Sequence, residues 1–226
     1  MLMRTAQLSV FLLLMTGGAG LAAAQSRPRV PREDTQSRPE VELAIPLYRG
    51  LELLLGGDLR AGRVVDARFL RGDVGVSYSY KPSKHVTLRP FYTYRALQEF
   101  TGPNENENRF SFEGKASVPF SRFVISDVNL FERRLRSSGN STRYRNLLKV
   151  ELPVKFGSAV MELFISDEVY YEWKDNAWTR NRFRIGADKK FGQRVETALF
   201  YMRQNDGFSR PGDIHIVGIE TEINFR

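Results

Sequence analysis

The chain has 226 residues and no cysteine, which excludes a disulfide framework and a lipid anchor on an N-terminal cysteine. Beyond the first 24 residues no stretch holds 18 uncharged apolar residues and the mean hydropathy is −0.37, so a helical membrane protein is excluded. The formal net charge of +8 suggests an anionic partner, but the arginines are spread along alternating segments instead of forming one patch, which argues against nucleic acid.

Residues 1–24 have the features of a secretory signal peptide: a positive charge at Arg4, an apolar run and three alanines before the expected cleavage after Ala24. Residues 25–39 are polar, with four arginines and three prolines, and predict a disordered periplasmic leader. Residues 40–226 remain as one domain, which we expect to be a β-barrel in the outer membrane of a Gram-negative bacterium.

An aromatic residue beside a tight turn recurs at Tyr80, Phe120, Phe156, Phe191 and Phe225, with spacings of 40, 36, 35 and 34 residues. Each interval contains a strand-like run, a longer polar loop, a second strand-like run and a short turn. This pattern is typical of hairpins in an up-and-down barrel that crosses an outer membrane.

Alternation within the runs sets which face meets lipid. Phe183, Ile185 and Ala187 share one parity, whereas Arg180, Arg182 and Arg184 share the other. An arginine that faces lipid near the midplane costs about 2–4 kcal/mol, so we expect these arginines to face the lumen.

The fold expected is all-β: a single up-and-down antiparallel transmembrane β-barrel of about ten strands, with eight or twelve also allowed. Short turns are expected in the periplasm and longer loops outside, and an even strand number places both termini on the turn side. The expected strands are 50–60, 67–80, 85–98, 107–119, 122–135, 142–155, 159–172, 179–191, 194–204 and 214–225. A soluble periplasmic β-sandwich is the alternative.

Two aromatic girdles follow from this arrangement. Tyr80, Phe120, Phe156, Phe191 and Phe225 are expected at the periplasmic rim, and Trp173 and Trp178 toward the loops. One residue fits poorly: Asp167 shares a parity with apolar residues and would point at lipid, for which a bulge or a position near the interface is the expected reason.

Charged residues of the opposite parity are expected to fill the lumen with arginine–glutamate pairs, because an unpaired charge there would carry a desolvation cost. The expected network contains Arg109, Glu113, Arg133, Arg143, Arg145, Glu151, Glu162, Glu168, Arg180, Arg182, Arg184, Glu220 and Glu222. This predicts a structural or binding protein; a narrow channel that prefers small anions is the alternative.

Catalytic chemistry has weak support in the sequence, and we expect no enzyme, cofactor or metal site. The two histidines, His85 and His215, fall at opposite ends of the expected barrel. A loop-side hydrolase that pairs His215 with Asp213 or another loop aspartate is the remaining alternative.

The stretch from Phe131 to Arg226, with FERRLR, RYRNLLKVELP, SDEVYYEW and NRFRIG, resembles the outer-membrane barrel family named domain of unknown function 2490. The resemblance implies an exported β-barrel and no established activity. The expected partners are outer-membrane lipid, lipopolysaccharide and, through the alternating last strand, the barrel-assembly machinery. Phe225 is followed by Arg226, whereas the usual assembly signal ends on an aromatic.

Overall fold

The computed structural model describes residues 31–62, 68–99, 104–157 and 159–225. The expected signal peptide over 1–24 and the leader up to residue 30 lie outside them. The described residues contain no helix long and apolar enough to cross a membrane. The strands are β1 Glu33–Tyr48, β2 Leu51–Gly62, β3 Arg68–Tyr78, β4 Tyr80–Ser83, β5 Val86–Glu99, β6 Glu105–Phe120, β7 Phe123–Arg136, β8 Ser141–Phe156, β9 Ala159–Glu172, β10 Ala177–Phe191, β11 Val195–Asp206 and β12 Asp213–Asn224.

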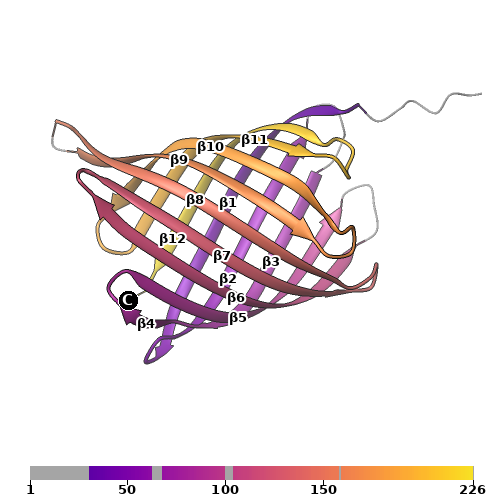
Figure 1. The fold of residues 1–226 in the computed structure, drawn as a ribbon, viewed down its shortest axis with the longest axis horizontal. Coiled ribbons are helices and arrows are strands. Elements are labelled where there is room, and N and C mark those ends of the chain that lie inside the picture. The colour runs from indigo at the N-terminus through magenta and orange to yellow at the C-terminus, as the bar shows by residue number, and fades with distance from the viewer. Residues whose placement is uncertain (1–30, 63–67, 100–103, 158, 226) are drawn as a thin grey trace, which may run out of the picture.

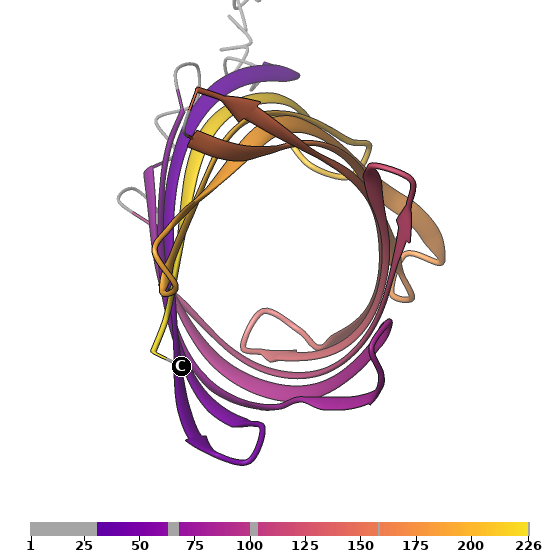
Figure 2. The ribbon, with the colours of Figure 1, turned by 90° about the vertical axis from the view of Figure 1, so that its left-hand side faces the viewer.

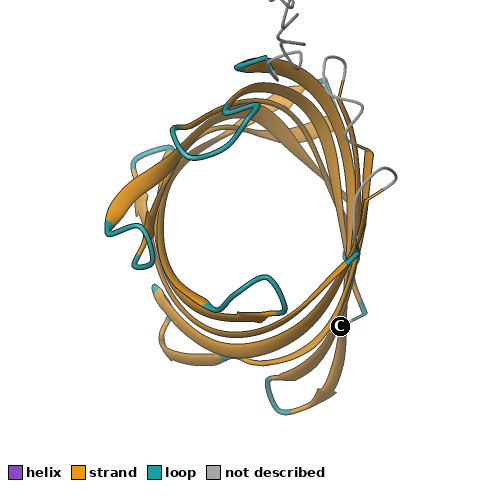
Figure 3. Cartoon of the chain, turned by 90° about the vertical axis from the view of Figure 1, so that its right-hand side faces the viewer, coloured by secondary structure: helices purple, strands orange, loops and turns teal. Residues whose placement is uncertain are grey.

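These strands form one closed barrel. Neighbours in sequence pair from β1 to β3 and from β5 to β12, β3 pairs with β5, and β1 pairs with β12 (Figure 1). Eleven strands make the wall, and the short β4 lies outside it, paired only with β5. Views along the barrel show the closed ring (Figures 2 and 3). A two-sheet sandwich is therefore excluded.

Strand β1 is the main departure from the sequence-based expectation. All ten expected strands are present, as β2, β3 and β5 to β12, but Glu33–Pro39 belong to β1 and not to a disordered leader. Backbone pairing with β12, from Glu33↔Asp213 to Ala44↔Asn224, holds this polar segment in the wall. Its prolines and polar residues conceal the strand in the sequence.

The pairing of β1 with β12 is parallel, whereas all other neighbours in the wall are antiparallel. Short connections such as Arg49–Gly50 and Ser121–Arg122 mark one end of the barrel, here called the turn end. Connections 137–140, 173–176 and 207–212 mark the other, the loop end. β1 runs from the loop end to the turn end, so the first strand of the barrel begins at the loop end and not at the turn end, as an even number of strands would require.

The two faces of the wall differ in chemistry. Outward residues are mostly apolar and exposed, as on β6, where Phe110 and Phe112 are 53% and 48% exposed. Inward residues are mostly charged or polar, apart from a buried cluster of Phe164, Phe200, Met202, Ile214 and Ile216. This distribution is the inverse of a soluble protein and is typical of a barrel that spans a membrane.

Aromatic residues lie at both ends of the wall. Tyr80, Phe120, Phe191 and Phe225 are exposed near the turn end. Phe156 ends β8 at the same level, and its side chain lies outside the described part of the structure. Trp173 and Trp178 are exposed at the loop end.

Candidate lumenal site

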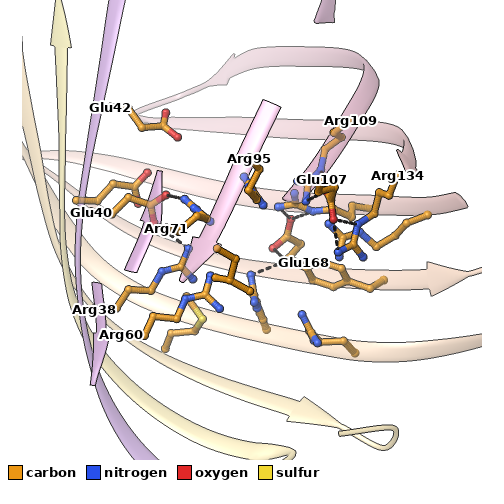
Figure 4. Close-up of a pocket in the computed structure, with 18 of the residues that line it drawn as sticks. Arg38, Glu40, Glu42, Arg60, Arg71, Arg95, Glu107, Arg109, Arg134 and Glu168 are labelled. Atoms are coloured by element: carbon orange, nitrogen blue, oxygen red, sulfur yellow. Dashed lines mark hydrogen bonds and ion pairs between the residues drawn. The ribbon is translucent and has the colours of Figure 1, made fainter. Parts of the chain in front are cut away.

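Two cavities occupy the lumen. One, of about 370 Å³, lies toward the loop end and is lined by eleven arginines and six glutamates (Figure 4). The other, of about 560 Å³, extends toward the turn end and is lined by six acidic and six basic residues. They share Glu42, Arg95, Arg109 and Arg145 in their linings, so they adjoin. The expected Arg–Glu pairs are present, but they leave space between them.

One ion-pair network surrounds Glu132, whose side chain is 1% exposed. Its carboxylate accepts hydrogen bonds from Arg109 Nη1 at 2.8 Å and Arg143 Nε at 2.6 Å. On the neighbouring strand, Glu107 accepts from Arg109 Nε at 2.6 Å and from Arg134 Nη2 at 2.9 Å. The strands β6, β7 and β8 bring these groups together because β6 pairs with β7, and β7 with β8, in register.

A second network surrounds Asp58 on β2, whose side chain is fully buried. Arg60 Nε lies 2.8 Å from one carboxylate oxygen, Arg71 Nε 2.5 Å from the other, and Arg38 Nε 3.4 Å away. Glu40 then bridges Arg38 and Arg71 at 2.9 Å and 2.6 Å. Three guanidinium groups thus share the carboxylate of Asp58. The side chains of these arginines also line the cavity (Figure 4).

Tyr170 on β9 is the centre of the third group. Its register partners are Arg145 on β8 and Arg180 on β10. The guanidinium carbons of four arginines lie 5.0–5.4 Å from its ring centroid: Arg143, Arg145, Arg180 and Arg182. Cation–π attraction holds these guanidinium groups without using their N–H donors.

Arg182 differs from the other arginines around this ring. Its Nε donates to Gln204 at 2.8 Å and its Nη1 to the Tyr170 hydroxyl at 2.7 Å, both neutral acceptors. Within the described parts of the chain it has no carboxylate partner in an ion pair. Arg182 therefore brings a cation without a direct ion pair to the lining of the loop-side cavity, although Glu168 is its register partner on β9.

Two glycines, on β10 and β12, shape the part of the wall next to this group. A Cβ atom on Gly218 would overlap the ring of Phe200, and one on Gly186 would overlap the ring of Phe164. Without those Cβ atoms the two rings lie close against the wall. Arg184 then stacks on Phe200, 3.9 Å from its centroid, and donates to Glu220 at 2.9 Å.

Carboxylates gather nearer the turn end. Glu42 on β1 is the register partner of Glu222 on β12, which is the partner of Glu196 on β11. Like charges placed directly opposite across strands repel. The charge of the lining therefore changes along the axis, from an excess of arginines around the loop-side cavity to equal numbers of acidic and basic residues around the other.

Twelve of the thirteen charged residues expected in the lumen lie on the inward parity of their strands. Glu113 pairs with Arg89, Glu151 with Lys149, and Glu162 with Lys190 near the turn end. Arg133 is the exception. Because Glu132 and Arg134 point inward, Arg133 points outward, where it is exposed and donates to Thr142 at 2.9 Å. In the sequence, the outward parity of Arg133 is indicated by the apolar Phe131, which shares it.

Several residues of these networks escaped the sequence-based selection. Those on β1 and β2, such as Arg38, Glu40 and Asp58, belong to or pair with the segment expected to be a leader. Glu132 and Arg134 could have been found from the alternation with Phe131. The role of Tyr170 follows from its register with arginines on both neighbouring strands, which period-two alternation does not give.

The two histidines lie apart, as expected. His85 Nδ1 lies 3.0 Å from the Ser117 carbonyl oxygen near the turn end. His215 lies on the outer face at the loop end, with Nδ1 2.6 Å from the Tyr201 hydroxyl. The carboxylate of Asp213 accepts from Arg32 at 2.6 Å and from Asn205 at 2.9 Å.

Residues 40–213 match the sequence family described as a protein of unknown function, DUF2490. The chain belongs to this family. Among solved structures, LpxR from Salmonella typhimurium is similar with a TM-score of 0.48 and 8% sequence identity, over 76% of this chain and 83% of LpxR. No curated protein matches the sequence. The family description assigns no activity.

Proposed function

We propose that this member of the DUF2490 family is a narrow outer-membrane channel that prefers small anions. The observation that carries the proposal is the loop-side cavity, whose lining has eleven arginines and six glutamates. Rings of arginine select anions in pores because they stabilise a negative charge that has lost part of its hydration.

The arrangement of the ion pairs supports this preference even though carboxylates are numerous. Asp58, Glu132 and Asp206 are buried against the wall, and several guanidinium groups share each of the first two. A guanidinium has five N–H donors, more than a shared carboxylate uses. The arginines that share Asp58 and Glu132 also line the cavity, and Arg182 adds a cation without an ion pair to a carboxylate in the described chain.

The size of the lumen supports a passage instead of a filled core. Eleven strands place the barrel between eight-stranded barrels, whose side chains fill the interior, and open porins with 16 or more strands. The two adjoining cavities provide space from the loop-end lining, with Glu105 and Arg134, to the turn-end lining, with Lys81 and Asn224.

The outer surface of the barrel supports the outer-membrane location in this proposal. Exposed apolar side chains cover it and aromatic residues lie at both ends, as in barrels of the outer membrane. Such barrels keep short turns in the periplasm and long loops outside, which sets the orientation that we propose. Assembly by the barrel-assembly machinery and contact of the loop end with lipopolysaccharide are part of the same proposal.

Solute uptake into proteoliposomes tests the proposed preference. Glucose, gluconate and glucosamine have nearly equal size and are neutral, anionic and cationic. We expect gluconate to enter fastest and glucosamine slowest, because the cavity lining attracts anions and repels cations. Faster entry of glucosamine would contradict the proposal. Impermeability to all three would instead favour a structural or binding role for the charged lumen.

A matched pair of variants assigns the preference to the lumen. Arg182→Gln removes the lumenal cation that has no direct ion pair, and Arg203→Gln makes the same change on the outward face of β11. Arg182→Gln should reduce the ratio of gluconate to glucosamine uptake several-fold, whereas Arg203→Gln should leave it unchanged. Equal effects of the two substitutions would assign the selectivity to overall charge.

A further inference from the structure

The outer wall of β7 to β10 interrupts the apolar surface of the barrel with a polar group, here called the amide patch. Its members share the outward parity on four adjacent strands: Asp127, Asn129, Asn146, Asp167 and Asn181. β9 pairs in continuous register on both sides of Asp167, so Asp167 faces outward without a bulge, which was one of the two reasons expected from the sequence.

Hydrogen bonds join the amide patch into two groups. Asn146 Nδ2 donates to Asp127 Oδ1 at 2.7 Å, and Asn129 Nδ2 donates to Asp127 Oδ2 at 2.8 Å. Asn181 Nδ2 donates to Asp167 Oδ1 at 2.8 Å. These side chains form an ordered polar surface, yet its two carboxylates have only amide donors as hydrogen-bond partners in the described chain.

Five aromatic side chains lie on the loop side of the amide patch and form the aromatic cluster. Ring contacts with centroids 5.0–6.4 Å apart connect Phe131, Tyr144, Tyr171, Trp173 and Trp178. The Tyr144 hydroxyl donates to Asn129 Oδ1 at 2.5 Å, which joins the cluster to the amide patch. A groove of about 540 Å³ continues this surface to the loop-end rim. Its lining includes Val169, Trp178, Asn181 and Asn205 and two ion pairs, Arg32 with Asp213 and Arg180 with Asp206.

The patch shortens the apolar band on this side of the barrel. On β6 the outward residues remain apolar from Phe120 to Phe110. On β7 the apolar run from the turn end stops after Ile125, and on β9 it stops after Ile165. A short apolar band is met by local thinning of the bilayer, which brings lipid headgroups down along the wall. Polar groups in full contact with hydrocarbon would otherwise carry a desolvation cost.

The chemistry of the surface selects among headgroups. The carboxylates and amides of the patch hydrogen-bond to one another, and their oxygens can accept further bonds from hydroxyl groups. The aromatic rings offer flat apolar faces. A sugar ring has hydroxyl groups at its edge and apolar C–H faces. A phosphate would be repelled by the carboxylates of Asp127 and Asp167.

We propose that the amide patch, the aromatic cluster and the rim groove form a binding surface for the sugar headgroup of a glycolipid in the adjacent leaflet. This inference uses the membrane location in the proposed function but not the anion passage. A failed uptake experiment would therefore leave it standing, because the surface lies outside the lumen.

Intrinsic tryptophan fluorescence tests the proposal directly, because the only two tryptophans of the chain, Trp173 and Trp178, both lie in the aromatic cluster. The barrel is reconstituted in phosphatidylcholine vesicles with increasing fractions of a monoglucosyl diacylglycerol or, in parallel, of phosphatidic acid. We expect a saturable change in emission with the glucolipid and none with phosphatidic acid. A response to phosphatidic acid, or no saturable response to the glucolipid, would overturn the proposal.

The variants separate this surface from general effects of a polar residue on the wall. Asn129→Leu with Asn146→Leu should abolish the response to the glucolipid. Asn108→Leu is the matched control, because Asn108 on β6 also accepts from a tyrosine hydroxyl, that of Tyr92 at 2.6 Å, but lies outside the patch. Heat-modifiable migration on a gel checks that each variant folds.

A measurement on the wild-type barrel does not depend on whether the variants fold. Native mass spectrometry of the wild-type barrel, released from a mixture of both lipids, should detect retained glucolipid in preference to phosphatidic acid. Equal retention of the two lipids, or an unchanged fluorescence response in the double variant, would reject the assignment.

Discussion

At the scale of single residues, the lumen is organised by carboxylates that several arginines share. Glu132 is the clearest case, because Arg109 and Arg143 both donate to it and its side chain is almost fully buried. Removing one member of a buried ion-pair network leaves its partners charged and unpaired, which costs more than the intact pair contributes. The position of such a residue within a network, not its charge, sets its contribution to stability.

Glu132→Leu should lower the free energy of unfolding by about 3–5 kcal/mol, because the buried Arg143 loses its shortest ion pair and Arg109 keeps only Glu107. Urea unfolding in lipid vesicles, followed by heat-modifiable migration, measures the change. Glu222→Leu is the control: its register partners Glu42 and Glu196 are also acidic, so its removal should be neutral or stabilising within about 1 kcal/mol. Similar losses for both variants would show that the shared-carboxylate account is wrong.

At the scale of the strand, the alternation of the sequence predicted ten strands and most inward faces correctly. It worked where the free-energy cost of an arginine in lipid decides which residues face inward, as on β10. It failed at Arg133, where two arginines are adjacent and one faces each way. It also failed at β1, whose polar first half is held by pairing with β12, a strand far away in the sequence. Such distant pairing leaves no periodic signal.

A disulfide between Ser37→Cys and Val217→Cys should form readily, because these outward residues are register partners across β1 and β12. The chain has no other cysteine, so the shifted mobility of the denatured, unreduced protein reports the bond. Leu55→Cys with Ile223→Cys is the comparison. These positions lie two strands apart, about 9–10 Å, which is beyond disulfide reach. A ten-stranded barrel without β1 would reverse the two results.

At the scale of the whole molecule, the odd number of wall strands separates the two ends of the barrel chain. β1 begins at the loop end beside Asp213, whereas β12 ends at the turn end. An even number of strands, expected from the sequence, would have placed both ends together. The barrel closes with a parallel pair when the number of wall strands is odd and with an antiparallel pair when it is even. A single missed strand therefore changes the end of the barrel at which the first strand is predicted to begin.

Cysteine labelling in intact cells tests this orientation. Arg32→Cys, at the exposed start of the barrel, should react with a membrane-impermeant maleimide added outside. Lys84→Cys, in the exposed turn after β4, should react only after the outer membrane is permeabilised. Labelling of Lys84→Cys alone in intact cells would mean that the barrel has the opposite orientation.

The reversal potential of single channels tests whether the arginine-lined lumen conducts and prefers anions. In a planar bilayer with a potassium chloride gradient, we expect discrete conductance steps and a reversal potential that is shifted from zero toward the equilibrium potential of chloride. Arg182→Gln should move the reversal potential back toward zero. A reversal potential shifted toward the equilibrium potential of potassium, or no conductance from correctly folded protein, would contradict an anion-preferring channel.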